Sequence, residues 1–314
     1  MAERKSGSLL LIIVCLVLAG VILMMQVDRL TSEVQASSKV PGSPAGLLDA
    51  ARGGNAQEIS RQIADKADVN VQVESHDAQP GEAGMTPLMF AAQSGSREAV
   101  ESLVKAQAKV EARSRDGRTA LMYAAGWADA ATVRVLLEAG ARIDARSNDQ
   151  WTALMMAASR GSLESMDALI AAGANMEFKN RWGQTALICA ALVADVDKVT
   201  KLIPGSPLNA TDASGLTALN VAAGGVENST AVVAALLAAG ADPKIADADG
   251  VTPLMRAADR GDAERATLLL KAGAPADAKD ASGRTALDWA AARDDDAGRA
   301  VAALLKGGQP LEAR

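Results

Sequence analysis

The chain has 314 residues, of which 49% are hydrophobic and 22% charged, and its formal net charge is −6. This composition is typical of a folded chain and excludes both a disordered chain and a basic nucleic-acid-binding protein. The two cysteines, Cys15 and Cys189, give no disulfide framework and no metal-ligand spacing, so we expect no metal and no cofactor.

The N-terminal region begins with a short segment, residues 1–8, which is followed by an apolar stretch at residues 9–27. At about 1.5 Å per residue, a helix of about 19 residues nearly spans a hydrocarbon core of roughly 30 Å. Arg4 and Lys5 precede the stretch and Asp28 follows it, which places the N-terminus in the cytoplasm and the rest of the chain on the far side. We therefore expect a transmembrane signal-anchor helix.

A cleaved secretory signal is the alternative, because Val34-Gln35-Ala36 resembles a cleavage site. Both interpretations export the rest of the chain. The expected location is the inner membrane, with a single pass and the folded domain in the periplasm, or a secreted or periplasmic protein if the segment is cleaved. Residues 28–44 are expected to be a stalk or linker, and Val27, Leu30 and Val34 leave weak self-association through a short coiled coil open.

From residue 45 to residue 308 the sequence repeats itself. An atypical first unit, residues 45–83, precedes seven copies that start near residues 84, 117, 150, 183, 215, 250 and 283, and residues 309–314 form a tail. Each copy contains Thr-Pro-Leu or Thr-Ala-Leu, and these motifs are spaced by 33, 33, 33, 32, 35 and 33 residues. Their threonines are Thr86, Thr119, Thr152, Thr185, Thr217, Thr252 and Thr285. Such a period indicates a solenoid of repeats.

One copy shows the structure of the unit. Thr252 is suited to cap a helix and Pro253 to occupy its first position. Ala257 and Ala258 allow a second helix to approach closely, and Gly273 ends that second helix. The polar segment 275–283 then has the composition of a hairpin turn. Each unit is therefore predicted to be helix, turn, helix and hairpin.

This pattern resembles the ankyrin repeat, over roughly residues 45–308. The resemblance implies an all-α solenoid with protein–protein interaction as its function. It rests on Asp249-Gly250-Val251-Thr252-Pro253-Leu254, Ala257-Ala258, Gly261, Leu269-Leu270 and Gly273-Ala274.

One departure from the family is systematic, because the histidine that follows Thr-Pro-Leu is replaced in every copy. In the family that imidazole ties neighbouring hairpins together, so we expect those bonds to be missing and methionine to fill the space. The replacements are Met89, Met122, Met155, Ile188, Asn220, Met255 and Asp288.

The other irregularities lie in loops. Glu74–Ala83 is an insertion that contains His76, the only histidine, which is expected to be solvated. Pro204–Pro207 replaces the usual end of the second helix in the fourth repeat, and the fifth and seventh repeats are longer between their helices. There is no glycine-rich phosphate loop, no metal cluster and no nucleophile with a histidine base, so we expect no catalytic residues and no enzyme.

The variable positions of the repeat indicate where a partner binds. We expect the position four residues after each Thr to lie exposed on the concave side, and the position eight after it to lie at the rim of the same groove. The predicted partner-binding residues at these positions and at the hairpin tips are Phe90, Tyr123, Trp127, Trp151, Met156, Arg160, Trp182 and Cys189. Trp289 and Phe178 are expected to fill local gaps instead.

The function predicted from the sequence is a membrane-anchored module that binds a protein partner through the concave groove and the hairpin tips. The alternative is an inhibitor or immunity-type protein that blocks a secreted or periplasmic enzyme, for which the long hairpin at Glu74–Ala83 would suit insertion.

Overall fold

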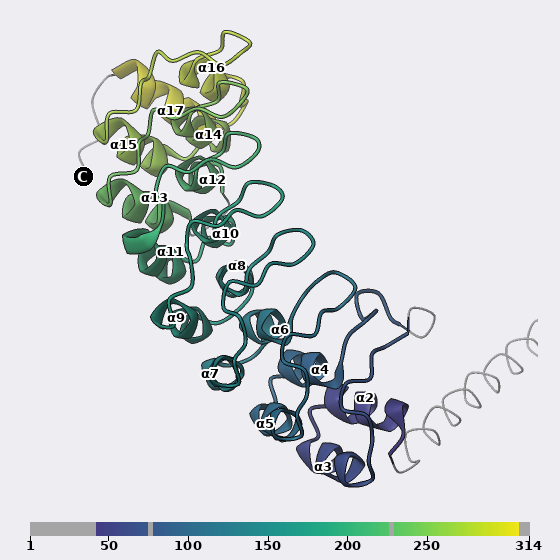
Figure 1. The fold of residues 1–314 in the computed structure, drawn as a ribbon. Helices are drawn as coiled ribbons and strands as arrows, with labels where there is room; N and C mark the ends of the chain where they lie inside the picture. Colours follow the sequence, from purple (N-terminus) through teal and green to yellow (C-terminus); the bar gives the residue numbers. More distant parts are fainter. Residues whose placement is uncertain (1–41, 75–77, 226–228, 308–314) are drawn as a thin grey trace, which may run out of the picture.

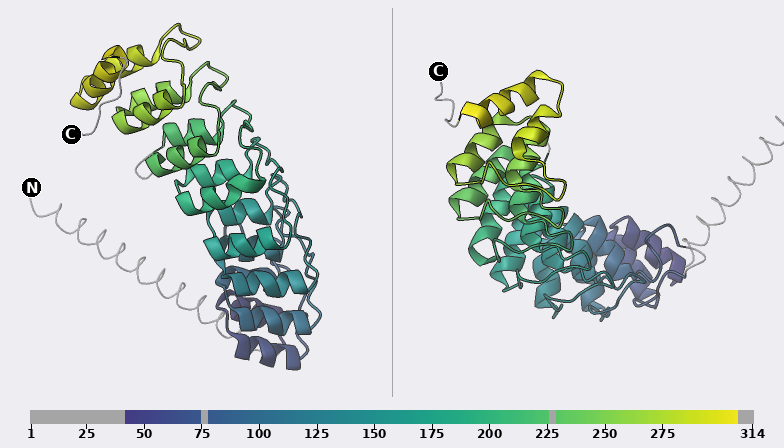
Figure 2. Two further views of the ribbon diagram at one scale, coloured as in Figure 1. Left: turned by 90° about the vertical axis from the view of Figure 1, so that its left-hand side faces the viewer. Right: turned by 90° about the horizontal axis from the view of Figure 1, so that it is seen from above.

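The computed structural model of the protein describes residues 42–74, 78–225 and 229–307. The described helices come in pairs, an inner helix next to the row of loops and an outer helix behind it, and the pairs stack into one curved array (Figures 1 and 2). No β-strand occurs in these three ranges. The prediction of an all-α solenoid is confirmed for the part of the chain that the structure describes.

The helices alternate strictly between the two layers. The inner helices are α2 (Pro44–Arg52), α4 (Pro87–Ser94), α6 (Ala120–Trp127), α8 (Ala153–Ser159), α10 (Ala186–Leu192), α12 (Ala218–Ala223), α14 (Pro253–Arg260) and α16 (Ala286–Ala291). The outer helices are α3 (Ala56–Ala64), α5 (Arg97–Lys105), α7 (Ala130–Glu138), α9 (Leu163–Ala171), α11 (Val196–Leu202), α13 (Ser229–Ala238), α15 (Ala263–Lys271) and α17 (Asp296–Gly307).

The repeat threonines begin the inner helices, as predicted. In six of the seven repeats the Thr hydroxyl accepts a hydrogen bond from the backbone N–H three residues later. Thr119 is the exception, because its hydroxyl forms no cap bond. Two residues after each Thr stands a leucine, and Leu88, Leu154 and Leu254 are typical in being fully buried. Burial of one such side chain stabilises the fold by about 1.5–3 kcal/mol.

The loops between the helix pairs have a recurring hairpin turn. In the second hairpin Ser114 N–H donates to Arg118 O at 2.9 Å, and its tip is joined to the next one by a bond from Asn148 N–H to Asp116 O at 2.9 Å. Gly183 at the tip of another hairpin has a positive φ of 77°, and a Cβ there would lie 2.6 Å from Ala213 N. Glycine is needed at such a tip because neighbouring hairpins approach closely.

Side chains also connect successive hairpins, in what we call the donor ladder. Each member donates to a backbone carbonyl of the next hairpin. The bonds run from Gln72 Nε2 to Arg113 O (3.2 Å), Arg113 Nη1 to Arg146 O (2.7 Å), Arg146 Nη2 to Lys179 O (3.2 Å) and Lys179 Nζ to Thr211 O (2.7 Å). The ladder therefore joins hairpins in the first half of the array, where methionine or isoleucine occupies the position of the family's histidine.

Asn220 supplies a further connection that the sequence did not lead us to expect. Its Nδ2 donates to Ile245 O at 3.1 Å, in the hairpin that follows α13. Met89, Met122 and Met155 are buried at the equivalent positions, as predicted. The expectation that all bonds at this position are missing is therefore wrong for the fifth repeat.

The first helix and the fourth repeat depart from the regular pattern. Helix α2 begins at Pro44 and is capped by Ser43, so these two residues belong to the first helix and not to the linker. In the fourth repeat α11 is followed by a single 3₁₀ turn, η1 (Ile203–Gly205), at the Pro-Gly-Ser-Pro segment.

Several predictions concern residues outside the described ranges. The predicted transmembrane helix at residues 9–27, the stalk as far as residue 41, His76 and the tail at residues 309–314 all lie there. Of the helices that the structure does describe, none combines the length and the apolar character needed to cross a membrane.

Candidate functional site

The side chains four residues after the repeat threonines do not form an exposed surface in the first four repeats. Phe90, Tyr123, Met156 and Cys189 are all buried, so the expectation that they lie exposed in the groove is wrong. They are part of the continuous apolar core of the array.

These side chains are buried because they point toward the inner helix of the preceding repeat. A Cβ added to Gly126 would lie 3.8 Å from Met156 Cβ, and the Arg52 guanidinium lies 4.7 Å from the centre of the Phe90 ring. Gly126 belongs to α6, the inner helix before the one that contains Met156. Arg52 belongs to α2, the inner helix before the one that contains Phe90. The side chain at this position therefore packs against the neighbouring inner helix, and stacking of the repeats removes it from solvent.

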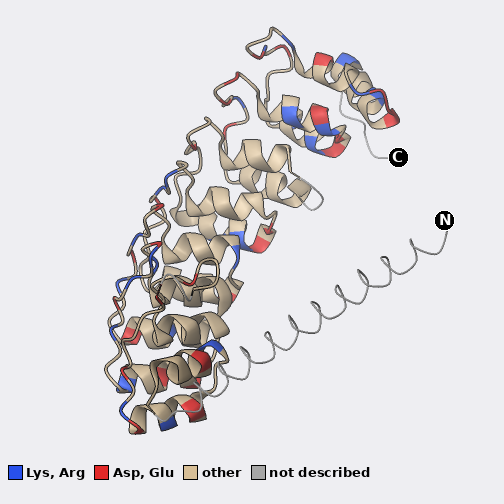
Figure 3. Ribbon diagram, turned by 90° about the vertical axis from the view of Figure 1, so that its right-hand side faces the viewer, with Lys and Arg blue, Asp and Glu red and all other residues tan. Residues whose placement is uncertain are grey.

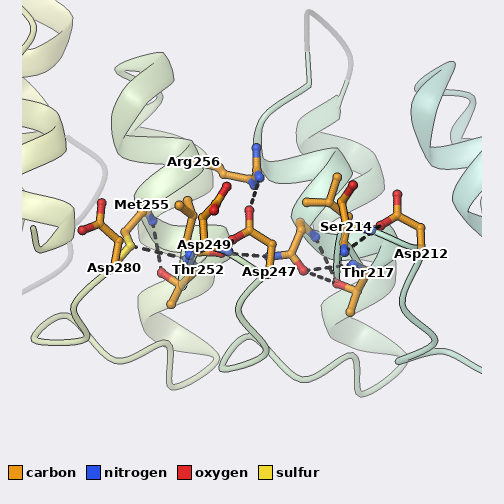
Figure 4. A network of polar contacts seen from close by, with 12 residues as sticks. Asp212, Ser214, Thr217, Asp247, Asp249, Thr252, Met255, Arg256 and Asp280 are labelled. Atoms are coloured by element: carbon orange, nitrogen blue, oxygen red, sulfur yellow. Dashed lines mark hydrogen bonds and ion pairs between the residues drawn. The ribbon is translucent and has the colours of Figure 1, made fainter. Parts of the chain in front are cut away.

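In the last two repeats the residue at this position has an N–H group that interacts with an aspartate of the hairpin before its helix. Arg256 forms an ion pair with Asp247, whose side chain is almost fully buried (Figure 4). Trp289 Nε1 donates to Asp280 Oδ2 at 3.0 Å. This bond agrees with the prediction that Trp289 fills a local structural gap.

The ends of the inner helices provide the exposed apolar surface. Trp127 and Val193, eight residues after their threonines, are 38% and 45% exposed, and Leu192, one position earlier, is 53% exposed. Arg160 is exposed at the same position as Trp127 in the next repeat. We call Trp127, Arg160, Leu192 and Val193 the helix edge. Trp127 and Arg160 were predicted to lie at the rim of the groove; both are exposed, Trp127 as the last residue of α6 and Arg160 directly after α8.

Trp127 contacts Tyr123, one turn earlier in the same helix, and Arg160 from the next repeat. The Trp127 ring centre is 5.9 Å from that of Tyr123, and the Arg160 guanidinium lies 5.5 Å from the Trp127 ring centre. These two contacts restrict the orientation of the indole.

A second aromatic cluster lies on the hairpins. The ring centres of Trp151 and Trp182 are 6.4 Å apart in an edge-to-face arrangement, and the Arg181 guanidinium lies 5.6 Å from the Trp182 ring centre. Trp182 is 46% exposed and Trp151 is half-buried. We call Trp151, Arg181 and Trp182 the hairpin edge. An inner helix of about seven residues, roughly 10 Å long, separates this edge from the helix edge.

Cys189 carries no reactive chemistry in this structure. It lies buried on α10, and burial raises the pKa of its thiol to about 12. At neutral pH the thiolate fraction is then negligible, and the side chain acts as a small apolar core residue.

Leu192 is the exposed residue that the sequence prediction missed. It occupies the position seven after Thr185, which lies outside the two columns in which partner-binding residues were predicted. The other residues of that column are small or polar, namely Gln93, Gly126, Ser159, Gly224, Asp259 and Ala292. A large apolar side chain in such a column indicates a surface rather than a core role.

The remaining candidates have structural roles or no ligand chemistry. Phe178 is partly buried under the Arg146 guanidinium, 5.2 Å from its ring centre, as expected of a residue that packs under its own hairpin. In the insertion, Glu82 is paired with Arg52 at 3.0 Å. Among the described residues, no group of three or more His, Cys, Asp or Glu side chains could hold a metal ion.

Comparison with known proteins identifies the repeat. The family model for ankyrin repeats in three copies matches residues 47–147, 130–212, 154–247 and 219–311, so that the matches together cover residues 47–311. No curated protein matches the chain.

Proposed function

Because the chain belongs to the ankyrin-repeat family, we propose that it is a non-enzymatic module that holds a protein partner between the helix edge and the hairpin edge. Ankyrin repeats generally mediate protein–protein interaction. The partner-binding residues that we propose are those predicted residues that are accessible, namely Trp127, Trp151, Arg160 and Trp182, together with Leu192 and Val193.

One observation carries this proposal. Within the described ranges, the large hydrophobic side chains that are exposed are Trp127, Trp182, Leu192 and Val193, and all four belong to three successive repeats. Tryptophan and arginine are the residue types most enriched in binding hot spots, and a concentrated apolar surface on a folded protein marks an interaction site.

Substitution of the two exposed tryptophans tests the proposal. We expect Trp127→Ala combined with Trp182→Ala to abolish capture of the partner from detergent-solubilised membranes, while the circular dichroism spectrum stays unchanged. The matched control is Lys105→Ala with Arg134→Ala, two exposed residues on the outer helices α5 and α7, which should leave capture intact. Equal recovery of the partner by both double variants would contradict the proposal. If the captured partner is an enzyme, its activity in the complex distinguishes a scaffold from an inhibitor.

We propose further that residues 9–27 anchor the array to the inner membrane with the repeats in the periplasm. The support is the apolar sequence of this stretch with Arg4 and Lys5 before it and Asp28 after it. Protease added to spheroplasts should then digest the repeats without lysis of the cells. Digestion only after lysis would contradict this orientation.

A further inference from the structure

Arg160 differs from the other arginines that occupy its position in the repeat. Arg260 Nε donates to Gly224 O at 2.7 Å, and Arg293 pairs with Asp295 and donates to Asp259 O. The Arg160 guanidinium lies over Trp127 and forms no ion pair with any residue that the structure describes. The charge of Arg160 is therefore available to a ligand at the edge of an exposed apolar surface.

The helix edge offers no carboxylate to Arg160. In the first five repeats the positions seven and eight after Thr contain no Asp or Glu, and Arg160 is their single charged residue. The nearest acidic residue in sequence, Glu164, lies in the first turn of α9, and no ion pair joins it to Arg160. Asp129 and Asp195, each two residues after Trp127 and Val193, cap the outer helices α7 and α11 by accepting from Thr132 N–H and Lys198 N–H. Both of these carboxylates are thus occupied by local structure.

The hairpins beside the exposed tryptophans are basic, although the whole protein is acidic. Residues 109–118, 142–151 and 175–184 contain eight Lys and Arg against five Asp and Glu. The corresponding segments of the next three hairpins, residues 207–216, 242–251 and 275–284, contain three Lys and Arg against six Asp and Glu. Charged residues of both signs line the loop row in Figure 3, whereas helices α12 and α13 carry none. A ligand at the first group of hairpins therefore meets a locally positive surface.

We propose that the groove selects an acidic peptide segment of its protein partner. A carboxylate of that segment pairs with Arg160, and apolar side chains on either side of it pack on Trp127 and on Leu192 with Val193. This specificity rests on the proposed function, because it names the chemistry of the partner at the same surface. Stacking on Trp127 holds the guanidinium in place, so that its N–H groups can donate to a carboxylate with little loss of side-chain freedom.

A displayed library of random 12-residue peptides, selected on the full chain in lipid nanodiscs, tests this inference. We expect the enriched peptides to contain Asp or Glu next to Leu, Phe or Trp. For a synthetic peptide of the enriched sequence, Arg160→Glu should weaken binding by roughly tenfold or more, as for close charge pairs at interfaces. Arg134→Glu, which makes the same change of charge on the outer helix α7, should change the affinity less than about twofold, as expected for a distant screened charge.

A charge exchange completes the test. A peptide with Lys in place of its acidic residue should regain affinity for the Arg160→Glu variant. Enriched peptides that depend on Trp127 but show no acidic preference would overturn the inference and leave the proposed function standing. If no peptide is enriched, or if Trp127→Ala has no effect on those that are, both proposals fail. Equal effects of Arg160→Glu and Arg134→Glu would also overturn the inference, because net charge alone would then explain the binding.

Discussion

Two equivalent threonines differ in the hydrogen bond that they make. The Thr152 hydroxyl accepts from Met155 N–H at 3.3 Å at the start of α8, whereas the buried Thr119 hydroxyl at the start of α6 has no hydrogen-bond partner within the described ranges. The two side chains are otherwise alike in burial and in the Ala-Leu that follows them. They form a matched pair in which only the cap bond differs.

Substitution of these two threonines should therefore have unequal costs. Thr152→Ala removes a cap bond and is expected to lower the free energy of unfolding by about 1 kcal/mol. Thr119→Ala removes a buried hydroxyl without a partner, so its cost should be smaller by about that amount. Urea unfolding of the two variants and the natural sequence measures both values. Equal losses would show that the Thr119 hydroxyl is bonded in solution.

At the scale of single elements, the last helix pair depends on ionised aspartates. Burial raises the pKa of Asp280, but hydrogen bonds from Arg284 N–H, the Trp289 indole and Ser282 N–H outweigh burial, and the net pKa is below its ordinary value. Bonds from Thr285 lower the pKa of Asp288. The hairpins that precede α6 and α8 have serine, Ser114 and Ser147, instead of aspartate at the position of Asp280.

Acid should loosen the last helix pair first. Because the pKa values of Asp280 and Asp288 are lower in the folded state, their contribution to stability is complete above the ordinary carboxyl pKa of 3.8 and is lost as the pH falls through the folded values. Hydrogen exchange of α16, corrected for the intrinsic rate, should accelerate more than exchange of α8 as the pH falls from about 4 to about 2. The Asp280→Asn variant keeps an acceptor without titrating, so its pH dependence should be smaller. Parallel loss of protection in α8 and α16 would contradict this order.

At the scale of the whole molecule, the features that form within one repeat could be predicted from the sequence, whereas the contacts between two repeats could not. The caps, the leucine core and the helix order follow from local chemistry and from the spacing of the threonines, and the structure confirms them. The burial of Phe90 and Met156 depends on the preceding inner helix, which a single repeat does not contain. The Asn220 bond to Ile245 O also joins two repeats, so the sequence of one repeat could not predict it either.

The donor ladder has a direction, because every bond runs from one hairpin to the next hairpin in the chain. Three residues, Arg113, Arg146 and Lys179, lie in successive repeat units, and each takes part in two bonds of the ladder. The side chain of each donates to the next hairpin, and its backbone carbonyl accepts from the hairpin before it. Tandem duplication of one such unit would therefore add a complete connection with each new copy, and loss of a unit would let its two neighbours join. An array of this kind can lengthen or shorten during evolution without a second, compensating substitution at the junction.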